Sequence, residues 1–285
     1  MKAFAFPIRT MAVTAAFASC AALVSTPASA QAPRPYQPEV GQQGKDVIWV
    51  PTPDEVVDRM LTMAQVKPSD YVVDLGAGDG KIAIAAAKKF GAKSLGIEYN
   101  PDMAKHAQGN AEKAGVSDKA RIVQGDIFAT DFKSATVLTM YLLPALNLKL
   151  RPTILTMKPG TRVVSHSFTM DDWEPDETSN MDGRRMFFWV VPANVQGGWK
   201  MSIAGGDVLD VSIDQRYQKI EGSVQLGGVH GGLREARLSG ENIAFTIVDA
   251  AGNRRSFSGR AGGGSMEGTV RSDNGTEARW TAAKK

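Results

Sequence analysis

The chain has 285 residues, of which 43% are hydrophobic and 22% charged, and its formal net charge is +3. This is an ordinary globular composition, and the length suits one large or two small domains. The near balance of charge gives no reason to expect nucleic acid or an anionic membrane as a partner. The single cysteine, Cys20, excludes a framework of internal disulfides.

The first thirty residues have the pattern of a secretory signal peptide. They contain two basic residues and no acid, an apolar run over 11–24, and the small residues Ala28 and Ala30 at the end. We therefore expect cleavage after Ala30 and a periplasmic or secreted protein, with an uncleaved anchor as the alternative. The apolar run is short for a bilayer span. We expect no transmembrane span in the mature chain, which would carry 31 basic and 30 acidic residues and no cysteine.

Two changes in composition divide the rest of the chain. Residues 31–47 hold several prolines and few apolar residues, which predicts a flexible lead-in. Of the 29 glycines, 17 lie after Ala193, and the hydrophobic pattern changes at the same point. We therefore predict a first domain over 48–193 and a second over 194–285.

The first domain alternates short apolar runs with helical stretches. "TPDEVVDRML" opens a helix, with Thr52 as its cap and Glu55 completing a capping box. Alternating strands and helices imply right-handed crossovers and a mostly parallel, Rossmann-like α/β sheet. Its last strands form an antiparallel hairpin that turns at Asp182 and Gly183. The strands are predicted over 71–75, 94–98, 121–124, 136–140 and 161–165, and the later helices over 82–90, from 100 onward and through 142–150.

The second domain alternates with a period of two. Leu209, Val211 and Ile213 are separated by polar residues, and glycine or asparagine turns recur between such runs. This pattern predicts about eight short antiparallel strands in a small all-β barrel or sandwich. Trp199 and Trp280 are expected in its core.

A glycine-rich turn, "DLGAGDG" at 74–80, follows the first predicted strand. Such a turn before a helix lets a ligand approach the backbone closely. Gly76, Gly78 and Gly80 do not fit the dinucleotide spacing, because Lys81 stands where its third glycine would be. Asp74, at the end of the strand, suits a positively charged ligand better than a pyrophosphate. S-adenosylmethionine carries both a sulfonium and an ammonium group, and it is the predicted cofactor.

Two further acids follow the next two strands. Glu98 ends the second strand and can accept hydrogen bonds from both hydroxyls of a ribose. Asp126 follows the third strand and can accept from the adenine amino group, with Ile127 or Phe128 against the ring. Each residue alone is explained as well by a turn or a helix cap. Together, in order, they predict a cofactor site at the carboxyl edge of the sheet.

These motifs resemble those of class I S-adenosylmethionine-dependent methyltransferases. The glycine turn corresponds to the first motif of that family, Glu98 in "GIEYNP" to its ribose-binding acid, and Asp126 in "GDIF" to its adenine-side acid. More narrowly, the stretches at 49–61, 141–146, 160–168 and 172–175 resemble the small protein-lysine methyltransferases of mitochondria and their bacterial relatives.

The resemblance implies that Pro51 and Thr52 approach the cofactor from the N-terminal side. It covers less than half of the chain, and 194–285 have no counterpart in those enzymes. The N/D-P-P-Y motif of enzymes that methylate amino groups on DNA or glutamine is replaced by "TMYLLP", so nucleic-acid and glutamine substrates are not expected. Tyr141 in this stretch is the candidate catalytic residue, placed to orient an amine, and packing is its alternative role.

The histidines His106, His166 and His230 are scattered, so no metal site is expected. The sequence thus predicts an S-adenosylmethionine-dependent methyltransferase acting on an amine, with protein lysine favoured over a small molecule. A small-molecule methyltransferase is one alternative. Another is a non-catalytic exported protein whose β-domain binds a protein, glycan or lipid. The β-domain recruits substrate, anchors the enzyme or forms a structural cap, and the oligomeric state is left open.

Overall fold

The structure is a computed structural model that describes residues 1–3, 5, 36–226, 229–249 and 251–285. Cys20, the predicted cleavage site at Ala30 and nearly all of the predicted signal peptide lie outside the described residues, as do the first five residues of the lead-in. Residues Tyr36–Lys285 pack as one unit. None of the helices described is both long enough and apolar enough to span a membrane.

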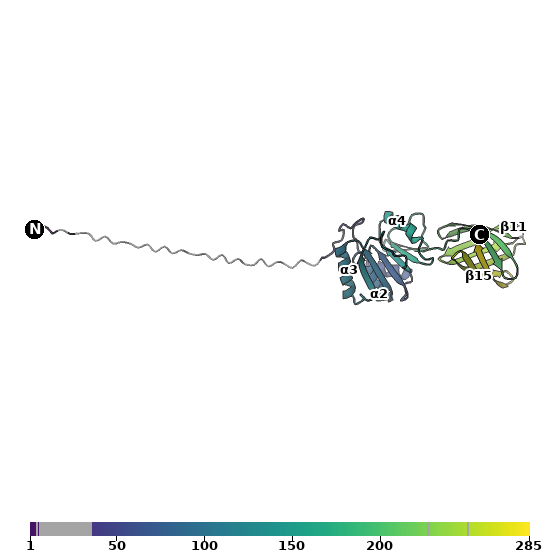
Figure 1. The fold of residues 1–285 in the computed structure, drawn as a ribbon, viewed down its shortest axis with the longest axis horizontal. Coiled ribbons are helices and arrows are strands. Elements are labelled where there is room, and N and C mark those ends of the chain that lie inside the picture. The colour runs from purple at the N-terminus through teal and green to yellow at the C-terminus, as the bar shows by residue number, and fades with distance from the viewer. Residues whose placement is uncertain (4, 6–35, 227–228, 250) are drawn as a thin grey trace. The chain divides into compact units, whose positions relative to one another are not determined.

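A seven-stranded mixed sheet forms the first half of the described chain, in the order β3-β2-β1-β4-β5-β7-β6 (Figure 1). Strands β1 to β5 run parallel, and β7 is antiparallel to β5 and to β6. The predicted Rossmann-like sheet and its final hairpin are thereby confirmed. The strands are β1 (Tyr71–Leu75), β2 (Lys93–Glu98), β3 (Ala120–Gln124), β4 (Val137–Met140), β5 (Arg162–His166), β6 (Glu177–Met181) and β7 (Arg184–Val190).

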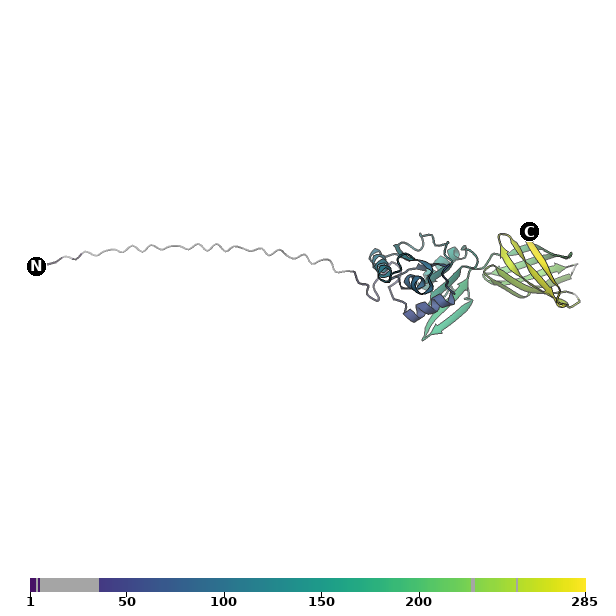
Figure 2. The same cartoon turned by 90° about the horizontal axis from the view of Figure 1, so that it is seen from below.

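Helices cover both faces of this sheet (Figure 2). Successive strand residues point to opposite faces, so Val72 packs with α1 and α2 while Val73 packs with α4. Small residues such as Ala87 and Ala107 fill the contact between α2, α3 and β3. The helices are α1 (Asp54–Met63), α2 (Lys81–Phe90), α3 (Pro101–Lys113) and α4 (Pro144–Ile154).

The starts of two helices differ in how they are capped. Asn100 caps α3 as expected, because its side chain accepts from the backbone N–H groups of Asp102 and Met103. The capping box predicted for α1 is wrong. Pro53 is the N-cap without a side-chain hydrogen bond, and the Thr52 hydroxyl lies 3.3 Å from Nδ1 of His166 instead. A buried tertiary partner at the end of β5 has displaced the local cap.

Where the structure describes it, the β-domain is a single antiparallel sheet of nine strands in a nearly closed barrel, against about eight strands predicted. Its ends approach each other where Leu233 N–H donates to the carbonyl of Gly222 in β10. The strands are β8 (Gly197–Ile203), β9 (Val208–Arg216), β10 (Lys219–Leu226), β11 (Val229–Gly232), β12 (Arg234–Ser239), β13 (Asn242–Val248), β14 (Arg254–Gly262), β15 (Ser265–Ser272) and β16 (Glu277–Lys284).

Aromatic side chains fill the interior of this barrel. Trp199 and Trp280 are both buried there, as predicted. Phe245 and Phe257 stack with ring centroids 4.9 Å apart. The indole N–H of Trp280 donates to backbone carbonyls of β14 and β15, so its polar atom is satisfied within the core. Between the two halves, β7 ends at Val190 and β8 begins at Gly197. The exact domain boundaries stay predictions.

Candidate active site

A cavity of ≈ 340 Å³ opens at the carboxyl ends of the parallel strands. It lies where the strand order reverses, with β1 between β2 and β4, which is where open α/β sheets bind their ligands. The predicted site residues that line it are Pro51, Thr52, Asp74, Gly76, Gly78, Glu98, Asp126, Ile127 and Tyr141. Gly80 is the one predicted site residue outside this lining.

The glycine turn keeps side chains out of the cavity. Gly76 and Gly78 have φ angles of 76° and 54°, which glycine adopts without strain. A Cβ atom on Gly76 would lie 2.9 Å from a methyl carbon of Leu142, and one on Gly78 would lie 2.5 Å from Nε1 of Trp49. At these two positions glycine therefore lets Leu142 and Trp49, which also line the cavity, pack against the turn.

Gly80 serves packing rather than the cavity wall. It is the N-cap of α2 with φ of 83°. A Cβ atom there would lie 3.2 Å from Cβ of Ala107 and 3.3 Å from Ile122. The absence of a side chain lets α2 begin close to α3 and β3.

Glu98, the last residue of β2, presents its carboxylate to the cavity. One oxygen accepts the backbone N–H of Gly78 and the other that of Asn100, both at 2.9 Å. These bonds fix the orientation of the carboxylate. Because a carboxylate oxygen has a second lone pair, both oxygens can still accept from a pair of hydroxyls.

Asp126 and Ile127 follow β3 on the same side of the cavity. One Asp126 oxygen accepts the backbone N–H of Phe128, and the other lies 2.7 Å from Nζ of Lys45. The hydrogen bond from Lys45 holds the pKa of Asp126 below its usual range. Ile127 adds an apolar surface beside this carboxylate, as a flat heteroaromatic ring requires.

Asp74 is buried at the inner end of β1, where its side chain accepts a 2.7 Å hydrogen bond from Thr139. Burial raises its pKa to about 7, and the nearby Asp79 and Glu98 add to that rise. Among the described residues, no basic side chain contributes to the shift of this pKa. A cationic group in the cavity would favour its ionised form.

The segment before α1 forms one wall of the cavity, and beyond Pro51 and Thr52 its residues were not predicted as part of the site. Residues 42–50 all line it, and a short antiparallel bridge joins Gln43 to Ile48. The indole of Trp49 lies against the glycine turn, and Nζ of Lys45 stands 4.7 Å from the ring centre of Tyr99. The sequence signal that could have indicated this wall is Trp49, a large aromatic residue just before the predicted helix.

Tyr141 lines the cavity, with two other rings beside it. Its ring centroid is 4.0 Å from that of His166 and 6.2 Å from that of Phe168, and Phe168 lines the cavity too. His166, which ends β5 behind Tyr141, is buried, and burial lowers its pKa to about 4. His166 is therefore neutral near pH 7 and supports both Tyr141 and Thr52.

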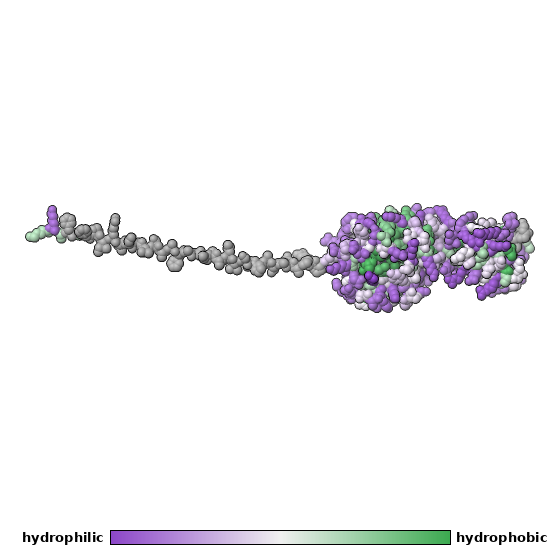
Figure 3. Space-filling view, viewed as in Figure 1, coloured by the Kyte–Doolittle hydropathy of each residue, from purple (hydrophilic) through white to green (hydrophobic). Residues whose placement is uncertain are grey.

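Apolar surface gathers on the visible face of this half, within an otherwise polar surface (Figure 3). Four of the exposed large hydrophobic side chains line the cavity, namely Ile48, Val50, Tyr99 and Leu143. Within the described residues, His, Cys, Asp and Glu form no group of three that could hold a metal ion.

The groups around the cavity fit the parts of S-adenosylmethionine. Glu98 offers two acceptors for the ribose hydroxyls, and Asp126 with Ile127 offers an acceptor and an apolar face for adenine. Asp74 is an acid that lines the cavity and is available to a cationic methionine end.

Comparison with known proteins agrees with this fit. The ANTKMT methyltransferase domain family matches residues 74–177. A protein-lysine N-methyltransferase of Saccharolobus islandicus is 46% identical over 142 residues, which are 49% of this chain and 88% of that protein. The mouse adenine nucleotide translocase lysine N-methyltransferase is 29% identical over 120 residues, which are 42% of this chain, and the match spans 52% of that protein's length.

A solved structure extends this to the cofactor. The crystal structure of an RNA methyltransferase from Salinibacter ruber in complex with S-adenosyl-L-homocysteine is 49% identical, with a TM-score of 0.50. The match covers 51% of this chain and 96% of that one. S-adenosylmethionine is accordingly the cofactor, and the chain belongs to the same family of S-adenosylmethionine-dependent methyltransferases as the Saccharolobus islandicus protein.

Proposed function

We propose that the chain transfers the methyl group of S-adenosylmethionine to the side-chain amine of lysine in a protein. The observation that carries this proposal is the 46% identity to a protein-lysine N-methyltransferase across 88% of that relative. The mouse relative named for lysine in the adenine nucleotide translocase supports the same acceptor group. We also propose which residues bind the cofactor and which receive the acceptor.

The residues at the carboxyl edge hold and orient the cofactor. Glu98 accepts from the ribose hydroxyls while its bonds to the glycine turn keep it in place. Asp74 faces the ammonium group, whose charge lowers the pKa of the acid from about 7. When bound, S-adenosylmethionine supplies a methyl group already activated by the sulfonium, so positioning is the main task left to the protein.

The wall formed by Tyr141, Leu143 and Phe168 receives the acceptor. A lysine amine attacks only in its neutral form, and a largely apolar wall lowers the pKa of an amine by desolvation. Tyr141, backed by the neutral ring of His166, orients the amine, which loses its proton to water before transfer. These side chains also restrict the access of solvent to the reacting atoms.

A transfer assay with labelled cofactor tests the acceptor class. The purified protein is incubated with radiolabelled S-adenosylmethionine and four acceptors: lysine-containing peptides, the same peptides with acetylated lysine, small primary amines, and RNA. The expected result is label on the unmodified peptides alone, located on lysine by mass spectrometry. Label on RNA alone would replace the proposal with the activity named for the Salinibacter ruber structure. Label on small amines alone would replace it with small-molecule methylation.

We also propose that the protein works after export, on the strength of the pattern of its first thirty residues. In that case the first residue of the purified envelope form is Gln31. N-terminal sequencing of protein taken from the producing cells checks this directly. Protein that begins at Met1 and is found with the cytoplasmic fraction would contradict it.

A further inference from the structure

The acceptor wall depends on residues 167–174, the first part of the connection between β5 and β6, which we call the acceptor loop. It begins after His166, carries Phe168 into the cavity wall and ends at Glu174. Two side chains of α4 hold it. The amide of Asn147 donates to the carbonyls of Phe168 and Thr169, at 3.4 and 3.2 Å. The guanidinium of Arg151 donates to the carbonyl of Met170 at 2.7 Å.

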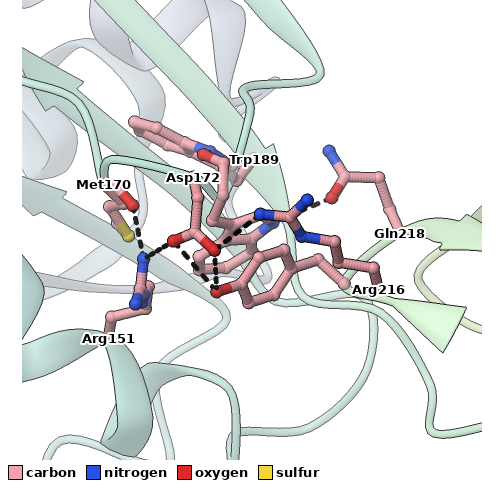
Figure 4. Close-up of polar contacts among 8 residues, drawn as sticks. Arg151, Met170, Asp172, Trp189, Arg216 and Gln218 are labelled. Carbon is pink, nitrogen blue, oxygen red and sulfur yellow. Dashed lines mark hydrogen bonds and ion pairs between the residues drawn. The ribbon is translucent and has the colours of Figure 1, made fainter.

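The β-domain contacts the same loop as well. The tight turn between β9 and β10, residues 216–219, meets the acceptor loop at Asp172 (Figure 4). The Asp172 carboxylate lies 2.5 Å from a nitrogen of Arg151 and 3.0 Å from one of Arg216. It also accepts from the hydroxyl of Tyr217 at 3.1 Å. The bond from Arg216, followed by that from Arg151, lowers the pKa of Asp172 to about 2, so the carboxylate stays ionised.

Trp173 extends this contact into the core. Its buried ring stacks on that of Tyr217, with centroids 5.9 Å apart and planes at 25°. Its indole N–H donates to the side-chain oxygen of Gln218 at 3.0 Å. The amide nitrogen of Gln218 donates in turn to the carbonyl of Glu174 at 2.7 Å. One turn of the β-domain therefore contacts three successive residues of the acceptor loop.

Tyr217 occupies a backbone conformation that glycine would adopt more easily. Its φ angle is +57°, in the left-handed region that bulky side chains rarely occupy. A strained conformation persists only where surrounding contacts stabilise it. The stacking on Trp173 and the hydrogen bond to Asp172 are such contacts. The turn thus carries a side chain whose benefit lies in the acceptor loop and not in the hairpin itself.

We propose that the β9–β10 turn is a positioning element of the active site, because its contacts with Asp172 and Trp173 keep the acceptor loop in the conformation that places Phe168 in the cavity wall. The β-domain then acts on the acceptor side of the reaction and leaves the cofactor side untouched. The inference rests on the proposed function, which assigns the Phe168 wall to the acceptor. Tyr217 and its neighbours touch no reacting atom, so they are positioning residues.

Tyr217→Gly in the full chain tests the proposal, because glycine suits the turn and removes only the side chain. The Michaelis constant for the lysine peptide should rise about tenfold, since small displacements at a reacting centre are costly. The dissociation constant of S-adenosylmethionine should stay within about twofold of the wild-type value, because Glu98 and the glycine turn are untouched. Tyr217→Phe keeps the ring on Trp173 and should restore most of the peptide affinity.

A control at another hairpin separates this effect from a general change in a turn. Asp182→Gly also replaces a residue of positive φ, 50°, by glycine, in the exposed β6–β7 turn. It should leave both constants unchanged. An unchanged Michaelis constant in Tyr217→Gly, or an equal rise in Asp182→Gly, would overturn the proposal.

Hydrogen–deuterium exchange supplies a readout that does not depend on activity. The amides of residues 167–174 should exchange faster in Tyr217→Gly than in the wild type, while those of β13 to β16 keep their rates. Equal exchange of the acceptor loop in both proteins would overturn the positioning role. If the wild type methylates no acceptor, the proposed function fails, and the exchange data still decide whether the turn orders the loop.

Discussion

Both halves of the described chain are stabilised by burial of apolar residues, and the first half also has a ligand-sized cavity at the edge of its sheet. In the parallel sheet, crossovers bring the strand ends to one edge, where acids and a glycine turn surround a cavity. In the β-domain, the sheet curls on itself and aromatic rings fill the space inside. The cavity described above therefore belongs to the first half, whereas aromatic side chains occupy the interior of the second.

Trp280→Ala is the strongest way to test whether the halves are separable. Truncating a buried tryptophan costs about 3–5 kcal/mol, and this indole also donates to two backbone carbonyls. The β-domain should unfold at much lower urea, whereas calorimetric affinity for S-adenosylmethionine should change less than about threefold. Thr281→Ala, exposed in the same strand, is the control. If Trp280→Ala lost cofactor binding at urea concentrations too low to unfold its first half, the two halves would not be separable.

Gly78→Ala tests the cavity of the first half. A Cβ atom there would meet the indole of Trp49 at 2.5 Å, so the wall must move. We expect the affinity for S-adenosylmethionine to fall about thirtyfold, some 2 kcal/mol. Gly115→Ala is the control, because its φ of +71° causes similar backbone strain while a Cβ atom there has no atom within 4 Å. This variant should bind S-adenosylmethionine as tightly as the wild type. If both variants lost the same affinity for S-adenosylmethionine, backbone strain and not the displaced cavity wall would explain the loss.

Asp74 gives the first half a pH dependence near neutrality, whereas the lowered pKa values of β-domain carboxylates such as Glu235 and Asp249 act at acid pH. Its folded pKa of about 7 lies above the value of about 3.9 expected in the unfolded chain. The folded protein therefore binds more protons in between, and this contribution to stability is lost as pH rises through 7. The quantity to measure is the free energy of unfolding of the wild type minus that of Asp74→Asn, both without cofactor. As pH rises toward 7, this difference should fall by at most about 1.4 kcal/mol per pH unit.

Urea titrations of both proteins at pH 5, 6, 7 and 8 provide this difference. His166 acts in the opposite direction, because its lowered pKa of about 4 makes stability fall as pH drops below 6.5. That contribution is common to both proteins and cancels when one is subtracted from the other. A difference that does not change with pH would show that Asp74 is ionised throughout.

Tyr141→Phe should have the smallest effect. Its ring contacts with His166 and Phe168 survive, and only the hydroxyl is lost. We expect the rate constant for transfer to fall less than about tenfold, the range of one neutral hydrogen bond. Tyr141→Ala, which removes the ring as well, should be slower by a further order of magnitude. Equal rates in all three proteins would make Tyr141 a packing residue only.

The sequence predicted those parts of the fold and site that depend on local pattern. Alternation of strands and helices indicated the sheet, and the acids Asp74, Glu98 and Asp126 were expected at its carboxyl edge, where the structure brings them together. Features that depend on distant contacts were missed. The Thr52 hydroxyl meets His166, 114 positions away, instead of capping α1. The segment over 42–50 has no periodicity, so only its packing on the glycine turn identifies it as a wall.

The lysine acceptor and the export of the protein stay predictions. The segment that predicts export lies almost wholly outside the described residues. An acceptor wall of aromatic and aliphatic side chains excludes little by itself, because apolar surface binds many shapes. The coupling of Asp172 to Tyr217 could not be expected either. Those residues lie 45 positions apart in different halves, and each looks like an ordinary loop or turn residue.

Calorimetric titration of S-adenosylmethionine into the purified protein, with Glu98→Ala and the exposed Glu112→Ala alongside, would show whether this cavity binds the cofactor. We expect micromolar affinity for the wild type and for Glu112→Ala. In Glu98→Ala the affinity should fall at least about a hundredfold, because two charge-assisted hydrogen bonds to the ribose disappear. Equal affinity in all three proteins would contradict the assignment of this cavity as the cofactor site.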